Sequence, residues 1–364
     1  MRLTSMPTRL PPGLLRRRLL LATGLAGLVS AGTTQALPAR ALQFPRDLGA
    51  HNAFRTEWWY ITGHVMAGQR AFGFQLTFFR SRIAATQAME SEFAAKQLIF
   101  AHAAITDVDG KQLWHDQRIA RAGFEIASAS EQDTAIKLRD WSLQRQAGRY
   151  VARLPAADFA LDLELTETQP LLLQGQQGLS RKGPEPKQAS YYYSLPQLDV
   201  SGSLSLKQQK FAVRGKAWLD HEWSDELLHP EATGWDWIGM NLLDGSALTA
   251  FQLRDKQGQA LWDGGSFRAP KAGLYTFSRG EVLFKPVRRW KSPLSQASYP
   301  VEWLVRTPAD IYTVRAVIDN QELDSRSSTG AIYWEGLSEL IDSNGKLVGR
   351  GYLEMTGYAS PLRL

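Results

Sequence analysis

Residues 57–76 read EWWYITGHVMAGQRAFGFQL, and residues 234–253 read GWDWIGMNLLDGSALTAFQL. The two stretches align without a gap at an offset of 177. Six of the twenty positions are identical, including a tryptophan and the tripeptide Phe-Gln-Leu. In both copies two apolar runs flank a glycine, which is typical of a strand, a turn and a second strand. The repeat therefore predicts an internally duplicated β-domain.

Alternation with a period of two dominates the rest of the chain. Phenylalanine or leucine occupies every second position from residue 72 to residue 78, and residues 159–166 repeat the pattern. Turn signals such as Asp109-Gly110 and Asn344-Gly345 separate the runs. Many short strands with tight turns predict an all-β fold of sandwiches or barrels. We expect two tandem all-β domains, at residues 44–224 and 225–364.

The N-terminal 41 residues have the pattern of a signal peptide. Residues 1–18 carry five arginines and no acid, and a mainly apolar run of thirteen residues follows at 19–31. The A-x-A pattern at residues 39–41 offers a cleavage site, and Ala36 an earlier one. The apolar run is shorter than the roughly 20 residues that span a bilayer. Paired arginines before it favour twin-arginine export over ordinary secretion, so we expect a periplasmic or secreted protein.

Charge and cysteine content exclude several classes of function. The chain has 42 basic and 36 acidic residues, but the predicted signal holds six arginines and no acid. The remainder is therefore close to neutral and lacks the basic surface that nucleic-acid binding requires. With no cysteine in the chain, thiol catalysis and cysteine-ligated metal are excluded. We expect no cofactor and no metal, since no phosphate-binding or zinc-binding motif is present.

The segment VRGKAWLDHEWS at residues 213–224 is the most informative for chemistry. As a strand, it places His221 and Trp223 on an apolar face that should point inward. Asp220 and Glu222 fall on the opposite face, toward solvent or the other domain. His221 is either a hydrogen-bonded core histidine or a proton donor or acceptor in an apolar cavity.

Glu57 and Trp59 share one face of the strand that opens the repeat. A carboxyl group beside an indole in a closed interior would have a raised pKa and could act as an acid. The alternative is a salt-bridged Glu57 within an aromatic barrel floor. His102 lies in an otherwise apolar strand and allows the same two interpretations as His221.

Aromatic side chains suit a large apolar ligand, although they more often fill barrels. The polar loop at residues 173–190 is long enough to be functional or disordered. We therefore predict a site with His221 and Glu57 as catalytic residues. The predicted ligand-binding residues are Trp223, Trp235, Tyr192, Trp59 and His102.

Several blocks in a fixed order resemble the AttH and carotenoid 1,2-hydratase family, a hydroxyneurosporene synthase-like group also labelled predicted secreted hydrolases. They include TEWWYITGHV, ASYYYSLPQL, GKAWLDHEWS and GRGYLEMTGY, and they extend over residues 50–360. The resemblance implies two lipocalin-like β-barrel domains. It also implies a cofactor-independent addition of water to an alkene, in which His221 and Trp223 match an H-x-W pattern of the hydratases. The Tyr-x-Asp pair of those enzymes is missing from residues 248–253.

Three functions follow from these observations. The first is a hydratase-like enzyme that acts on a large, apolar, unsaturated molecule, such as a lipid, polyene or isoprenoid, where the two domains meet. The second is a non-catalytic periplasmic carrier of a lipophilic ligand, close to the envelope membrane. The third is a secreted hydrolase, which rests on the family label alone.

Overall fold

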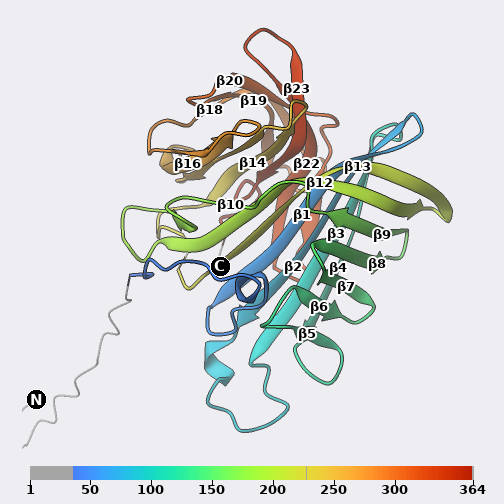
Figure 1. Ribbon diagram of the computed structural model, residues 1–364, viewed down its shortest axis with the longest axis vertical. Helices are drawn as coiled ribbons and strands as arrows, with labels where there is room; N and C mark the ends of the chain where they lie inside the picture. Colours follow the sequence, from blue (N-terminus) through green and yellow to red (C-terminus); the bar gives the residue numbers. More distant parts are fainter. Residues whose placement is uncertain (1–35, 227, 363–364) are drawn as a thin grey trace, which may run out of the picture. The chain divides into compact units, whose positions relative to one another are not determined.

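The computed structural model describes residues 36–226 and 228–362, and these residues form two antiparallel β-sheets (Figure 1). The first sheet contains β1 (Thr56–Ala67), β2 (Arg70–Arg82), β3 (Gln97–Asp107), β4 (Gln112–Arg121), β5 (Ala127–Ala129), β6 (Ala135–Leu138), β7 (Trp141–Gln146), β8 (Arg149–Pro155), β9 (Phe159–Thr166), β10 (Leu172–Leu173), β11 (Leu179–Arg181), β12 (Ala189–Leu206) and β13 (Gln209–Ser224). The second contains β14 (Gly234–Leu242), β15 (Ala247–Arg254), β16 (Ala260–Arg268), β17 (Leu274–Phe277), β18 (Leu283–Lys291), β19 (Ser298–Arg306), β20 (Ile311–Ala316), β21 (Glu322–Ser325), β22 (Ala331–Ile341) and β23 (Leu347–Met355). Two short 3-10 helices, η1 (Arg46–Leu48) and η2 (Ala84–Thr86), complete the described elements.

The two sheets have the same topology. In the first, β1 pairs with β2 on one side and with the final strand, β13, on the other. In the second, β14 pairs with β15 and with the final strand, β23. The first sheet curves around a single apolar core into a nearly closed barrel. The expected all-β fold of two lipocalin-like domains is therefore confirmed.

The sequence repeat coincides with equivalent hairpins of the two sheets. Residues 57–76 lie in β1 and β2, and residues 234–253 lie in β14 and β15. Gly68 and Gly245 both have positive φ angles in the connecting turns, a conformation that favours glycine. Tyr60 and Trp237 occupy equivalent positions, since they are 177 residues apart. Each faces a carboxyl residue on the final strand of its own sheet.

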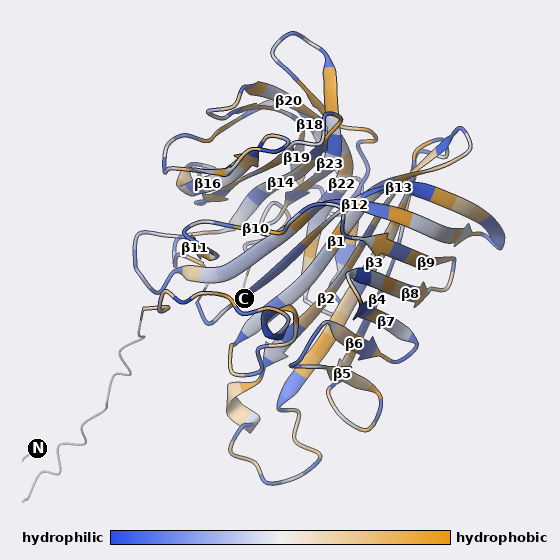
Figure 2. Ribbon diagram, in the orientation of Figure 1, coloured by the Kyte–Doolittle hydropathy of each residue, from blue (hydrophilic) through white to orange (hydrophobic). Residues whose placement is uncertain are grey.

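Alternation decides which side of each strand enters the barrel core. On β2, Phe74 and Leu76 are fully buried inside the first barrel. Gln75 and Thr77 point the other way and are buried as well. By contrast, the outer ends of β12 and β13 alternate between hydrophobic and hydrophilic residues, which is typical of strands with one face in water (Figure 2). The centre of the first sheet is thus covered on both faces.

The chain before β1 contacts the first barrel. Residues 1–35, which carry most of the predicted signal peptide, lie outside the described residues. Residues 36–41 of the predicted signal peptide are described, and among them Arg40 forms an ion pair with Asp47, with 2.7 Å between Nη1 and Oδ2. The Tyr191 hydroxyl donates to the Pro38 carbonyl oxygen over 2.5 Å. Residues 38–40 are therefore part of the folded structure.

Among the described residues, no helix has the length and apolar character needed to cross a membrane.

Candidate functional site

Strand β13 divides the predicted site between two environments. His221 and Trp223 face the barrel interior and are fully buried. Glu57 and Trp59 join them there, because Glu57 lies opposite Trp223 and Trp59 opposite His221 in the register of β1 and β13. The His221 ring stacks on Trp59 at 4.5 Å between centroids. The structure thus brings these four predicted residues together.

Glu57 is the centre of a buried polar network, here called the interior cluster: Asp47, His51, Glu57, Arg80, Tyr193 and His221. One Glu57 oxygen lies 2.7 Å from His51 Nδ1 and 2.9 Å from His221 Nε2. The other accepts a hydrogen bond from Arg80 Nε over 2.7 Å. His221 Nδ1 contacts the Tyr193 hydroxyl at 3.0 Å. Glu57 is therefore salt-bridged, as the second sequence interpretation proposed.

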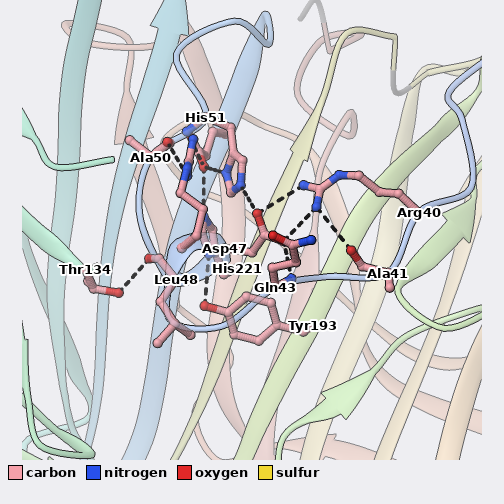
Figure 3. Close-up of polar contacts among 12 residues, drawn as sticks. Arg40, Ala41, Gln43, Asp47, Leu48, Ala50, His51, Thr134, Tyr193 and His221 are labelled. Carbon is pink, nitrogen blue, oxygen red and sulfur yellow. Dashed lines mark hydrogen bonds and ion pairs between the residues drawn. The ribbon is translucent and has the colours of Figure 1, made fainter. Parts of the chain in front are cut away.

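Charges alternate through the interior cluster. Burial alone would raise the pKa of Glu57, but hydrogen bonds from His221 and His51 hold it well below its usual range. His51 Nε2 lies 2.9 Å from Asp47 Oδ1 (Figure 3). The other ring nitrogen, Nδ1, faces Glu57. Since both neighbours are carboxylates, which only accept hydrogen bonds, both ring nitrogens of His51 must donate. His51 is thus a cation between two anions.

The interior cluster includes three groups that could hold a metal ion: His51, Glu57 and His221. However, Arg80 already places a positive charge on the Glu57 carboxylate. The pKa of His221 is lowered to about 4, chiefly by burial, so this ring is neutral at pH 7. Alternating charges and matched hydrogen bonds favour an ion-pair network that holds the segment before β1 against the barrel.

A cavity of about 910 Å³ lies on the opposite face of β1 and β13, between the two sheets. Aromatic residues from both sheets line it: Trp58, Tyr60, Phe79, Phe100, Tyr192, Trp235, Trp237, Phe251 and Tyr333. Its volume suits a ligand of drug or lipid size. Of the predicted ligand-binding residues, Trp235, Tyr192 and His102 line the cavity. His221, Glu57, Trp223 and Trp59 lie behind its wall.

Asp220 is a carboxyl group of the cavity that accepts three side-chain hydrogen bonds. It accepts hydrogen bonds from Ser194 Oγ at 2.5 Å, Trp218 Nε1 at 2.7 Å and the Tyr192 hydroxyl at 2.8 Å. Burial raises the pKa of Asp220 to about 7, although these hydrogen bonds oppose the rise. Near neutral pH, this residue can therefore both donate and accept a proton.

Glu222, two residues along the same face, forms an ion pair with Lys182. The distance from Lys182 Nζ to Glu222 Oε1 is 3.0 Å, and Ser190 also donates to this oxygen. The ammonium group lies over the rings of Tyr192 and Phe251, at 4.8 and 4.4 Å from their centroids. Lys182 follows β11, so the predicted polar loop is ordered here and contributes a cation to the cavity.

The second sheet adds two carboxyl groups, Glu335 on β22 and Glu354 on β23. They are direct neighbours in the register of these strands. Burial raises the pKa of Glu354 to about 7. Burial and the charge of Glu354 raise the pKa of Glu335 well above its usual range.

His102 lies at the contact between the sheets. The Gln117 side-chain NH2 donates to the Asp324 carbonyl oxygen, so its amide oxygen accepts the single hydroxyl hydrogen of Ser328. His102 Nε2, 2.8 Å from Ser328 Oγ, must then be the donor, and Nδ1 accepts from the Tyr333 hydroxyl at 2.8 Å. Burial lowers the pKa of His102 to about 3, consistent with a neutral ring. His102 is therefore not placed to deprotonate Ser328.

Sequence reasoning missed several residues of the interior cluster and several carboxyl groups of the cavity. The alternation on residues 213–224 placed Asp220 and Glu222 toward solvent or the other domain without deciding between them, and His221 was preferred as the catalytic residue. His51 comes from an irregular segment with no periodic signal. In the sequence, Glu335 and Glu354 have the pattern of solvent-facing residues of ordinary strands. Only the packing of the first sheet against them places them in the cavity.

Comparisons with known proteins agree with the architecture. An AttH-like family model matches residues 35–358. A crystal structure assigned as AttH from Nitrosomonas europaea is 47% identical, with a TM-score of 0.83, covering 89% of this chain and 99% of that one. A search of curated proteins gave no significant match.

Two further structures share the fold at low identity. Kievitone hydratase from Nectria haematococca has a TM-score of 0.69 and 12% identity, over 88% of this chain and 94% of that one. CghA has a TM-score of 0.51 and 13% identity, over 90% and 96%. The family match and the 47% identity confirm the resemblance seen in the sequence: the chain belongs to the AttH-like family.

Proposed function

We propose that the protein is a cofactor-independent enzyme that adds water to a carbon–carbon double bond of a large apolar molecule bound between the sheets. The observation that carries this proposal is Asp220, a buried acid with a pKa raised to about 7 within an aromatic cavity. An acid whose pKa is near the working pH is well suited to proton transfer. The shared fold of kievitone hydratase supports the same reaction class.

The reaction proceeds in two steps. Asp220 donates its proton to one alkene carbon, and the π electrons form the new C–H bond, which leaves a cation on the other carbon. Water then attacks this carbon, and Glu222 accepts the proton that the water loses. Proton transfer from Glu222 to Asp220 through solvent restores both groups, so the net change is the addition of one water molecule.

The cavity wall can stabilise the cationic intermediate. Trp58 and Trp235 line the cavity from the two sheets, and their π faces attract positive charge. The carboxylate that Asp220 becomes adds a negative charge beside the cation. The aromatic wall also limits the entry of additional water molecules.

The roles of His221 and Glu57 change accordingly. Both lie behind the cavity wall, so they support β1 and β13 and do not touch the ligand. The H-x-W pattern then marks the strand that carries Asp220 and Glu222.

Isotope labelling tests this function. The protein is incubated with a panel of terminal isoprenoid alkenes in H₂¹⁸O, and products are analysed by mass spectrometry. We expect one ¹⁸O atom per product, with turnover reduced about 10²- to 10⁴-fold in Asp220→Asn. Asp199→Asn, at an exposed ion pair on β12, is the matched control. Full turnover in Asp220→Asn would refute the assignment, and tight binding without any product would favour the carrier function.

Export to the periplasm or beyond remains part of the proposal, since the predicted signal peptide supports it. In that location the substrate would be an apolar molecule of the cell envelope. The hydrolase alternative has weaker support, because the Ser328 hydroxyl hydrogen is directed to Gln117 and not to a base.

A further inference from the structure

Glu335 and Glu354 form a carboxyl pair that the proposed reaction does not use. Directly opposed residues of neighbouring antiparallel strands have Cβ atoms about 4.5–5.5 Å apart, so two charges here would repel each other. No lysine or arginine of residues 36–226 or 228–362 forms an ion pair with either group. The buried lysine of the cavity, Lys182, is paired with Glu222. The pair therefore lacks a counter-charge within the described chain.

Two polar atoms beside the pair make no hydrogen bond of ordinary distance and angle in the described structure, although the two groups lie close enough to influence each other's pKa. One is Glu335 Oε1, on a side chain that is 2% exposed, and the other is the Tyr60 hydroxyl, on a side chain that is 6% exposed. Both residues line the cavity. Buried polar atoms normally have partners, so this position is suited to a polar group of the ligand.

Aromatic rings surround the same position. Trp237 is the register neighbour of Glu354 on β14, and its ring meets Tyr60 edge-on at 5.3 Å. Tyr333 lies two residues before Glu335 and also lines the cavity. Carboxylates together with aromatic faces are the combination that binds ammonium groups, through ion pairing and cation–π attraction.

We propose that Glu335 and Glu354, with Tyr60 and Trp237, form a recognition subsite for a protonated amine carried by the apolar ligand. This inference rests on the proposed function only in that both use the same cavity. The ammonium group donates hydrogen bonds to the carboxyl oxygens of the pair and to the Tyr60 oxygen, and its positive charge takes the place of the proton that two adjacent buried acids otherwise retain. The apolar part of the ligand then extends along the aromatic wall toward Asp220.

Binding measurements test this subsite without any turnover. Dodecylamine and dodecanol share the same twelve-carbon chain and differ in the cationic head. At pH 8, below the micelle concentration of the amine and the solubility limit of the alcohol, quenching of tryptophan fluorescence reports their affinity, because Trp58, Trp235 and Trp237 line the cavity. We expect the amine to bind at least about tenfold more tightly than the alcohol, from hydrogen bonds to charged groups. Equal affinity of the two probes in the unmodified protein would overturn the proposal.

Variants test whether the preference for the amine over the alcohol depends on Glu335 and Glu354. In Glu335→Gln/Glu354→Gln the amine should lose its advantage, while dodecanol binds as before. Glu339→Gln, on the same strand but in a partly exposed ion pair with Arg315, should retain the advantage. An advantage that persists in the double variant would overturn the assignment to this pair. If the double variant does not fold, Glu354→Gln alone should reduce the advantage. Since these readouts need no reaction, loss of activity in Asp220→Asn leaves them unaffected.

Discussion

The Tyr192 hydroxyl donates a hydrogen bond to Asp220 across β12 and β13, over 2.8 Å between Oη and Oδ2. This bond favours the charged form of Asp220 and opposes the effect of burial. The bond therefore lowers the pKa of Asp220, the acid on which the proposed reaction depends.

The first prediction concerns this bond. Tyr192→Phe removes a donor to the Asp220 carboxylate, so the pKa of Asp220 should rise further. Activity of the proposed enzyme requires protonated Asp220 and should fall as pH rises through about 7 in the unmodified protein. In Tyr192→Phe this fall should move to higher pH in a profile of kcat/KM. An unchanged profile with a uniformly lower rate would indicate a packing role only.

The second prediction links Asp220 to stability. Its pKa is near 4 in an unfolded chain and is raised to about 7 in the folded protein, so the folded state holds the extra proton between these values. Its contribution to stability should therefore decline as pH rises from 5 to 8. Asp220→Asn removes this titration.

Urea unfolding of both proteins at pH 5 and pH 8 measures the effect. The free energy of unfolding of Asp220→Asn, compared with that of the unmodified protein at the same pH, should be higher at pH 8 than at pH 5. A pH-independent difference in the free energy of unfolding would contradict a raised pKa.

The third prediction concerns the interior cluster. Glu57→Gln leaves the buried Arg80 guanidinium without its carboxylate. Breaking a buried ion pair in this way should lower the free energy of unfolding by about 3–5 kcal/mol. Glu164→Gln removes the exposed ion pair with Arg149 and should cost about 1 kcal/mol or less. Equal losses in the two variants would show that the interior cluster does not stabilise the barrel.

The fourth prediction concerns the segment before η1. A chain that begins at Leu42 lacks the Arg40–Asp47 ion pair and the Tyr191–Pro38 hydrogen bond. It should be less stable than a chain that begins at Leu37 by about 1–2 kcal/mol, as measured by chemical unfolding. This result would favour Ala36 over Ala41 as the processing site, if the predicted export signal is removed. Equal stability would leave the later site just as suitable.

The fold was predictable because it depends on local patterns. Alternation assigned the faces of β13, and the repeat at residues 57–76 identified the two equivalent hairpins. The cavity was less predictable, because it forms between two sheets whose arrangement no local pattern records. The sequence around Asp220 alternates in the same way whether this face of the strand meets water or another sheet. The preference for His221 followed its apolar neighbours, which in the structure are the inside of the barrel.

The repeat has one consequence for the cavity. Asp220 faces Tyr60 and Glu354 faces Trp237, so the duplication gives each wall an acid at the same structural position. Their surroundings differ at the next strand, where Asp220 neighbours the Ser194 hydroxyl and Glu354 neighbours a second carboxyl group. One ancestral position can thus have diverged into a proton donor on one wall and an anchor for positive charge on the other. An unsymmetrical ligand would take its direction in the cavity from that divergence.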